Sequence, residues 1–232
     1  SITLDPLTFM SYMASRMKNM KFGTSAIVLP TRNPVILAKE LATLDFLSRG
    51  RLLLVVGLGS NESSDFSAVG VDVSERAQRT DESIRIMKKL WTEESVSFHG
   101  RFNSLEKITL LPRPHQAGGP PIWIGGRSKA ALKRVGNLGD GWLVSAATSE
   151  EVSSGITEIK GYASKANNVI EDDHYGVFLP FLFAKSERDA LIEISKQPVF
   201  RQDIAPESYM ALGNPLEIRK RIQSYRRNRK NC

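Results

Sequence analysis

Hydrophobic and polar positions along this 232-residue chain follow two alternating patterns, one typical of helices and one typical of buried strands. Apolar residues at helical spacing follow Asp5-Pro6 and Asn33-Pro34, where a capping residue precedes proline at the first helical position. The second of these helices is predicted to place four leucines on its inner face: Leu37, Leu41, Leu44 and Leu47. Short apolar runs between the helical segments predict strands buried on both faces, as in a parallel sheet. The predicted strands are Phe22–Leu29, Leu52–Val56, Pro121–Ile124, Gly141–Val144 and Val177–Ala184.

The remaining segments complete a strand–helix alternation. Ser74 is predicted to cap a helix that runs to Trp91, and an excursion of short strands follows over Val96–Leu111. Four more helices are predicted: 129–137, Glu150–Lys165, Ser186–Lys196 and Pro215–Arg227. This order predicts the α/β class. An open doubly wound sheet and an incomplete eight-stranded barrel both fit it, and periodicity does not choose between them.

Composition narrows the class of protein. Hydrophobic residues make up 41% and charged residues 25% of the chain, values that are ordinary for a globular protein. No apolar run reaches the ~18 residues of a membrane span, and the first ten residues lack a signal-peptide pattern. The single cysteine, Cys232, allows neither an internal disulfide nor a cysteine metal cluster, so nothing requires an oxidising compartment. We therefore expect a cytoplasmic protein without a membrane partner.

The net charge of +7 is concentrated near the end of the chain, in Arg219–Lys230. Such a tail can bind nucleic acid or an anionic membrane, or it can be a solvated helix end. Apart from Tyr225, no aromatic residue is interleaved with these charges, and we expect no nucleic-acid partner. The three histidines are not at metal-ligand spacing, and no metal site is predicted.

Candidate chemistry lies where α/β folds place it, at the carboxyl ends of strands. The small residues Thr24, Ser25 and Ala26 follow Gly23 in the first predicted strand, where they would let a flat ring approach the backbone or form a packed bulge. Gly57, Gly59 and Ser60 follow the second strand. They resemble the start of a dinucleotide fingerprint without its third glycine, and they also suit a tight turn.

A third segment lies between the strand Pro121–Ile124 and a helix. It contains Gly125, Gly126, Arg127 and Ser128. A helix amino terminus offers unpaired N–H groups to an anion, two glycines allow close approach, and arginine and serine can add donors. The segment therefore predicts a phosphate site, and the alternative is a glycine turn with a serine cap. No serine–histidine–aspartate arrangement can be assigned, and no catalytic residue is predicted.

The order of these motifs resembles the luciferase-like family of flavin monooxygenases and deazaflavin-dependent oxidoreductases. The resemblance covers nearly all of Asp5 to Leu143, including KFGTSAIVLP, RLLLVVGLGS and PPIWIGGRSK, and Ala211–Arg221 is similar to a late family helix. It implies an eight-stranded α/β barrel with an insertion, here around 92–120, in a single domain over residues 1–232. On that template counterparts of the first two strands and of the eighth strand are missing from this chain.

The resemblance also implies a cofactor site. Ser25 and Ala26 match the bulge under the isoalloxazine ring, with Thr24 nearby, and Gly57, Gly59 and Ser60 match the loop that lines the ring or the phosphate. The stretch Gly125–Ser128 matches the phosphate-binding turn. The implied activity is oxidation of a small organic substrate with reduced FMN and oxygen, with a flavin reductase as partner. The deazaflavin coenzyme and hydride transfer are the alternative.

Readings from other classes stay open. The chain could be a non-catalytic barrel relative that serves as a structural partner of a second chain. It could also be a barrel enzyme that binds sugar phosphates without flavin. Retention of flavin favours the family reading over both.

A barrel without three of its strands has open sheet edges, which offer unpaired N–H and C=O groups to another chain. We therefore expect the isolated chain to be unstable or to form homo-oligomers. Sedimentation and thermal unfolding of the purified chain test this expectation. A cooperative transition in a monodisperse monomer would contradict it.

Overall fold

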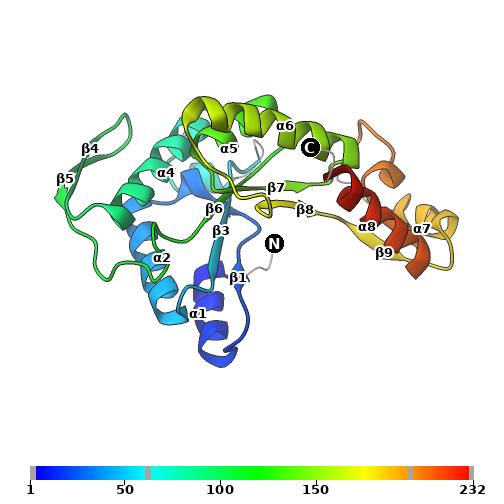
Figure 1. Cartoon of the computed structure of the whole chain (residues 1–232), viewed down its shortest axis with the longest axis horizontal. Helices are drawn as coiled ribbons and strands as arrows, with labels where there is room; N and C mark the ends of the chain where they lie inside the picture. The colour runs from blue at the N-terminus through cyan, green and yellow to red at the C-terminus, as the bar shows by residue number, and fades with distance from the viewer. Residues whose placement is uncertain (1–3, 61–63, 198–200, 230–232) are drawn as a thin grey trace. The chain divides into compact units, whose positions relative to one another are not determined.

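The computed structural model describes residues 4–60, 64–197 and 201–229, and the predictions made for Lys230 and Cys232 lie outside these residues. The chain divides into two compact units, which are described separately (Figure 1). Unit 1 comprises Ser1–Gly125 and Leu138–Asp140, and unit 2 comprises Gly126–Asn137 and Gly141–Cys232. No helix among the described residues is both long enough and apolar enough to cross a membrane.

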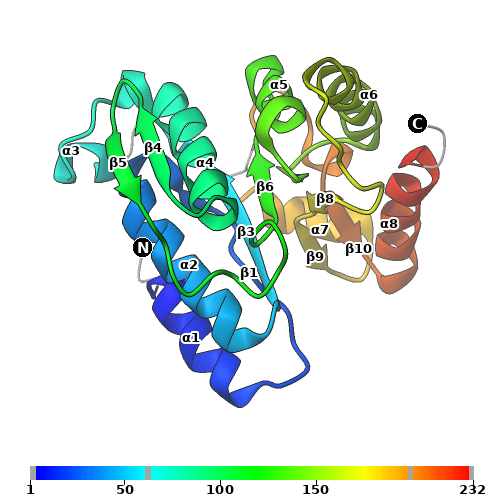
Figure 2. The ribbon, with the colours of Figure 1, turned by 60° about the vertical axis from the view of Figure 1, so that its left-hand side comes forward.

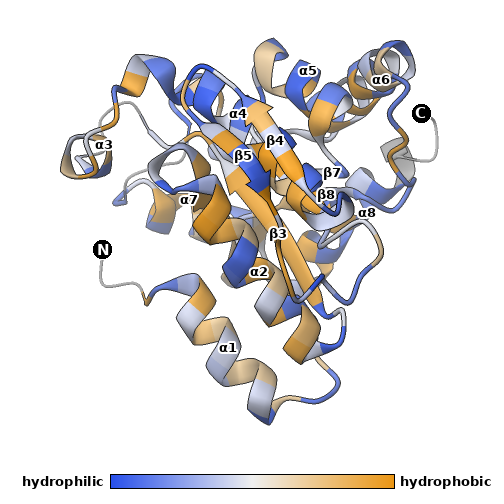
Figure 3. Ribbon diagram, turned by 90° about the vertical axis from the view of Figure 1, so that its left-hand side faces the viewer, coloured by the Kyte–Doolittle hydropathy of each residue, from blue (hydrophilic) through white to orange (hydrophobic). Residues whose placement is uncertain are grey.

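Unit 1 is an α/β layer built around one buried strand. Its elements are α1 (Pro6–Arg16), β1 (Phe22–Gly23), β2 (Ile27–Val28), η1 (Leu29–Thr31), α2 (Pro34–Ser48), β3 (Leu52–Gly57), α3 (Asp65–Ala68), η2 (Val73–Glu75), α4 (Arg76–Thr92), β4 (Val96–His99), β5 (Ser104–Ile108) and β6 (Ile122–Gly125). Parallel pairing joins β3 to β1 and β2 on one side and to β6 on the other. Figure 3 shows β3 as a mostly hydrophobic strand. The helices α2 and α4 pack against each other and bury their apolar faces.

Unit 2 contains two further parallel pairs. Its elements are α5 (Lys129–Leu138), β7 (Gly141–Ser145), α6 (Ser149–Ala166), β8 (Tyr175–Phe178), β9 (Phe181–Phe183), α7 (Glu187–Ile194), η3 (Pro206–Ser208), β10 (Ala211–Gly213) and α8 (Pro215–Arg229). Strand β7 pairs with β8, and β9 pairs with β10. A small core is formed by Ala146, Ala190, Tyr209, Met210 and Leu212, of which Ala190 belongs to α7 and Leu212 to β10. The α/β class predicted from the sequence is confirmed.

Local capping signals place the helices well. The side chain of Asp5 accepts hydrogen bonds from the first turn of α1, and that of Asn33 does the same for α2, as predicted. Ser74 is not a cap: Asp72 accepts from the Ser74 N–H at 2.8 Å, and a short 3-10 turn precedes α4. The prediction that Leu47 lies on the inner face of α2 is also wrong, because its side chain is 70% exposed. At about 100° per residue it lies about 80° around the helix from Leu37, off the buried face.

Two predicted strands are interrupted. The segment Phe22–Leu29 forms β1 and β2 with three residues between them, and the segment Val177–Ala184 falls on β8 and β9. Pro180 lies at the second interruption, because proline has no N–H to donate to a strand ladder. Strand β10 was not predicted, since three residues are too short to show a pattern.

The excursion of short strands is an antiparallel hairpin of β4 and β5, and Figure 2 shows it beside α4. The buried carboxylate of Glu82 on α4 holds its turn. It accepts hydrogen bonds from Arg101 N at 2.8 Å, Phe102 N at 3.1 Å and Asn103 Nδ2 at 2.8 Å. A Cβ atom added at Gly100 would lie 2.4 Å from this carboxylate, so a side chain there would push the carboxylate away from its donors. The hairpin is thus fixed to α4 by a local polar contact.

Replacing Glu82 with alanine should lower the free energy of unfolding by about 2–3 kcal/mol, because it leaves the hairpin donors without an acceptor. Urea denaturation measures the change. Glu93→Ala is the control, since Glu93 forms an exposed i,i+4 pair with Lys89 and should cost no more than about 0.5 kcal/mol. Equal losses in the two variants would show that the Glu82 contacts do not hold the hairpin.

Candidate functional site

The first candidate segment lies in unit 1, between β1 and β2. Here the Thr24 side chain takes the place of a backbone partner of β3: its hydroxyl donates to Val55 O at 2.7 Å and accepts from Val55 N at 2.9 Å. The residue is buried. The hydroxyl hydrogen of Thr24 is therefore used by the fold, so this residue shapes the segment and does not donate to a ligand.

Ser25 and Ala26, which follow Thr24, are exposed, and the peptide bond between them is cis. Beside them lies Gly57, at the end of β3: a Cβ atom added to this glycine would lie 3.6 Å from the Ala26 Cβ. Small side chains on both strands thus leave a shallow surface of backbone and methyl groups. Such a surface can support a flat ring.

The sheet register places Gly125 on the same edge. Strands β3 and β6 are parallel with Val56 opposite Ile124, so Gly57 and Gly125 follow at corresponding positions. Beyond Gly57, the backbone of Gly59 has a φ of +77°, and a side chain there would lie 2.8 Å from Val28 Cγ1. Unit 1 therefore brings together five predicted residues at the carboxyl edge of its sheet: Thr24, Ser25, Ala26, Gly57 and Gly125. The predicted residue Ser60 follows Gly59 and is exposed.

The other predicted phosphate residues open α5 in unit 2. Gly126 has a φ of +118°, and a Cβ atom there would lie 2.9 Å from the Ala131 Cβ. Its carbonyl accepts a hydrogen bond from Trp142 Nε1 at 2.8 Å. Ser128 caps the helix, because its Oγ accepts from Ala131 N at 3.2 Å. The turn is exposed and precedes the amino terminus of α5, an arrangement that suits an anion.

Arg127 contacts the loop after β7. Its Nη1 donates to Ala146 O at 2.9 Å, and this carbonyl also accepts from Arg201 Nη1 at 3.2 Å. Arg201 is buried and forms ion pairs with Glu151, at 2.6 Å, and with Asp203. The motif Thr148-x-x-Glu151 was readable as a capping box, which the structure contains. Arg201 carries no local signal, and sequence reasoning missed it.

The charges in this group keep one another ionised. Hydrogen bonds with Asp203 and Glu151 raise the pKa of Arg201, and those from Arg201 lower the pKa of Asp203 to about 2. Burial opposes ionisation of Glu151, but hydrogen bonds from Arg201 and from the backbone of Thr148 outweigh it and lower its pKa. The charge of Arg127 lowers the pKa of both carboxyls further. The two carboxyls and Arg201 are therefore charged near neutral pH.

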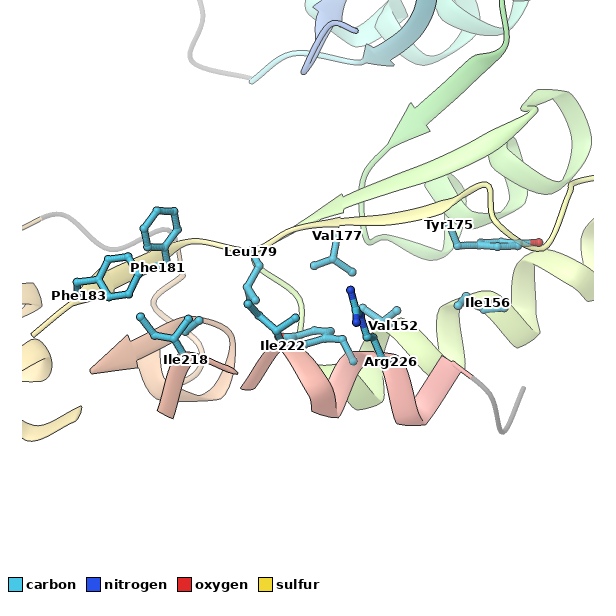
Figure 4. A pocket seen from close by; sticks show the side chains of 12 residues that line it. Val152, Ile156, Tyr175, Val177, Leu179, Phe181, Phe183, Ile218, Ile222 and Arg226 are labelled. Atoms are coloured by element: carbon cyan, nitrogen blue, oxygen red, sulfur yellow. The ribbon is translucent and has the colours of Figure 1, made fainter. Parts of the chain in front are cut away.

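A pocket of about 570 Å³ in unit 2 lies between β8, β9, α6 and α8. Figure 4 shows Val177, Leu179, Ile218 and Ile222 along its wall and Arg226 within it. None of the predicted cofactor residues lines it. A smaller pocket of about 130 Å³ contains Arg127 together with Trp142 and Glu151. Within unit 2, the larger pocket is thus lined by other residues than the predicted phosphate turn.

Comparison with known proteins gives a consistent result. The family described as luciferase-like monooxygenase matches residues 1–230. The chain is 29% identical to an F420-dependent glucose-6-phosphate dehydrogenase of Amycolatopsis mediterranei over 190 residues, 80% of this chain and 56% of that protein. It is 31% identical to an FMNH(2)-dependent dimethylsulfone monooxygenase of Pseudomonas putida over 155 residues, 65% of this chain and 42% of that protein. The chain thus spans about half the length of these curated relatives.

Solved structures support the fold. A monooxygenase from Streptomyces bottropensis superposes with a TM-score of 0.80 at 23% identity, over 97% of this chain and 72% of that one. With the parallel strands of both units, this confirms the predicted fold, an incomplete (β/α)8 barrel of the luciferase-like type. The described residues contain no group of three or more His, Cys, Asp or Glu side chains that could hold a metal ion.

The loop after β3 should tolerate no side chain at Gly59. Gly59→Ala combines an unfavourable φ with a clash against Val28 and Phe66, and we expect it to lower the free energy of unfolding by about 3 kcal/mol or more. Gly70→Ala is a matched control, since its φ is +68° with nothing within 4 Å of the added Cβ. It should cost only about 1–2 kcal/mol from strain. Equal losses in urea denaturation would contradict this account of the loop.

Proposed function

The chain belongs to the luciferase-like monooxygenase family, and on this basis we propose that it is a flavin-type oxidoreductase whose ring site is the carboxyl edge of the sheet in unit 1. The observation that carries the proposal is the surface formed by Ser25, Ala26 and Gly57, where a Cβ on the glycine would meet a methyl group at 3.6 Å. A larger side chain at Ala26 or at Gly57 would occupy the space of a ring.

The phosphate is proposed to bind at the turn that opens α5. The first N–H groups of a helix have no intrahelical partner, and the helix dipole favours an anion there. Gly126 lets the backbone turn, Ser128 retains its hydroxyl hydrogen for donation, and Arg127 retains guanidinium N–H groups beyond the one on Ala146. These donors match a phosphate monoester.

A flavin supplies the redox chemistry when it is bound, and the protein binds it, orients it and shields it from water. In this chain, Thr24 keeps the bulge in place through Val55, and Trp142 fixes the carbonyl of Gly126. Both contacts make the surfaces rigid before a ligand arrives, so that little ordering is needed on binding. The substrate is proposed to be a small organic molecule that meets the exposed face of the ring.

Two forms of this function are proposed in order. The first is a monooxygenase that uses oxygen and reduced FMN, with the reduced FMN supplied by a separate flavin reductase. This form agrees with the relative of Pseudomonas putida that is named for FMNH(2). The second is a deazaflavin-dependent dehydrogenase. It is favoured by the relative of Amycolatopsis mediterranei, named for F420, which is aligned over 80% of this chain.

Titration of the purified chain with FMN and with the deazaflavin coenzyme separates the two forms. Fluorescence of the cofactor reports binding. Saturable binding of one cofactor at micromolar concentration supports that form of the function. Binding of neither cofactor would contradict a flavin site in this chain, and sugar phosphates would then be titrated to test a phosphate site without flavin.

The phosphate assignment predicts selective loss of affinity. Arg127→Ala combined with Ser128→Ala should weaken FMN binding by about tenfold or more, since charge-assisted hydrogen bonds contribute about 1.5–3 kcal/mol each. Binding of riboflavin, which lacks the phosphate, should stay within twofold. Lys133→Ala is the control, because it removes an exposed positive charge from the same helix. Unchanged FMN affinity in the double variant would show that the phosphate binds elsewhere.

A further inference from the structure

The loop after β7 is the meeting point of two arginines from distant parts of the sequence. Ala146 has a φ of +49°, and its carbonyl oxygen accepts from Arg127 Nη1 at 2.9 Å and from Arg201 Nη1 at 3.2 Å. The Ala146 carbonyl thus connects Arg127, in the predicted phosphate turn, to Arg201, which lies 74 positions later in the sequence. The conformation of Arg127 depends on where this carbonyl is held.

Arg201 holds that position firmly. Its side chain is only 6% exposed, and its guanidinium donates to Glu151 Oε2 at 2.6 Å and to Asp203 Oδ1 at 2.9 Å. Its backbone N–H donates to the hydroxyl of Tyr209 at 3.3 Å, and its guanidinium lies over the Tyr209 ring. A buried guanidinium with two carboxylates and a carbonyl has one stable arrangement, so Arg201 is well ordered by its surroundings.

The balance of charge in this group has a consequence for anions. Two positive charges, on Arg127 and Arg201, face two negative charges, on Glu151 and Asp203, so the four side chains sum to zero. The influence of Arg127 on the pKa of both carboxyls indicates that these charges act on one another. Removing Arg201 would leave two carboxylates to attract the Arg127 guanidinium and to repel any anion at the turn. Neutrality therefore depends on Arg201.

We propose that Arg201 is a positioning residue for the phosphate site: it neutralises Glu151 and Asp203 and fixes the Ala146 carbonyl, so that Arg127 stays available to a phosphate monoester at Gly126–Ser128. This inference rests on the proposed phosphate site and adds a part of the chain that no local motif marks. Arg201 itself does not contact the ligand, because its donors are engaged within the protein.

The test compares FMN with riboflavin, because the ratio of their dissociation constants isolates the contribution of the phosphate. Arg201→Gln should weaken FMN binding by tenfold or more and leave riboflavin within twofold. The triple variant Arg201→Gln, Glu151→Gln, Asp203→Asn removes both carboxylates together with Arg201 and leaves Arg127 as the only charge of the four, so it should return FMN affinity to within threefold of the starting protein. Glutamine at 151 can still form the capping box with Thr148, so helix α6 is kept.

A purely structural role for Arg201 gives a different result. Arg201→Gln would then weaken FMN and riboflavin equally, and the triple variant would not recover, and either outcome overturns the proposal. Unchanged FMN affinity in Arg201→Gln also overturns it. Circular dichroism checks the fold of each variant.

Two further variants apply if Arg201→Gln does not fold. Glu151→Gln and Asp203→Asn should each tighten FMN relative to riboflavin by about two- to fivefold, because Arg127 then shares its charge with fewer acids. No change in the ratio in both variants overturns the proposal.

Failure of the proposed flavin function gives another result, because the unsubstituted chain would bind neither FMN nor riboflavin. The turn can then be probed with inorganic phosphate, by the concentration-dependent rise of the melting temperature. Arg201→Gln should abolish at least half of that rise, and the triple variant should restore it. An equal rise in all three proteins, or none in the unsubstituted chain, overturns the assignment of Arg201 to a phosphate site.

Discussion

The hydroxyl of Thr24 pairs with backbone groups of β3 that the interruption between β1 and β2 leaves without a strand partner. A surface of small residues requires the strand beside β3 to break between β1 and β2, and a break leaves the N–H and C=O of Val55 inside the protein without partners. Such groups cost about 1–3 kcal/mol each when unpaired. One hydroxyl donates to the carbonyl at 2.7 Å and accepts from the N–H at 2.9 Å, so β3 stays paired on both sides. On the other side of β3, the pairing of Val56 with Ile124 places Gly125 at the position that corresponds to Gly57.

In unit 2 the loop after β7 is likewise held by hydrogen bonds from side chains to its backbone. The segment after β7 receives Arg127 and Arg201 at Ala146 and the hydroxyl of Tyr225 at Ala147, the last at 2.7 Å. Three separate elements thus fix two consecutive carbonyls, and burial of Tyr225 raises its pKa, so its hydroxyl remains a donor. The order of this loop comes from these side chains together with one backbone hydrogen bond, from Ala146 N to Phe178 O of β8 at 3.3 Å. Loops in α/β folds carry binding residues on a rigid scaffold, and here the scaffold includes these long-range hydrogen bonds.

Features that depend on neighbours in sequence were predicted well. The caps Asp5 and Asn33 act within one turn, and the apolar run of β3 is buried over most of its length. The errors have local causes as well. Ser74 looked like a cap because the 3-10 turn with its cap at Asp72 has no distinctive pattern, and Leu47 was assigned to a face that the helical period carries it away from. The sequence also showed which residues have no large side chain at the strand ends, and these residues form the edge in unit 1.

What could not be predicted is the set of contacts that joins distant positions. Arg201 lies in a polar segment without helical or strand periodicity, and its partners are 50 and 55 residues away at Glu151 and Ala146. No pattern of hydropathy predicts such a pair, because hydropathy assigns an arginine to the surface and does not indicate that this one is buried. Burial makes the pairing obligatory, since a lone guanidinium in this position would be strongly unfavourable. Two acids near one buried base are therefore expected on physical grounds once the arginine is placed, but the placement itself requires the fold.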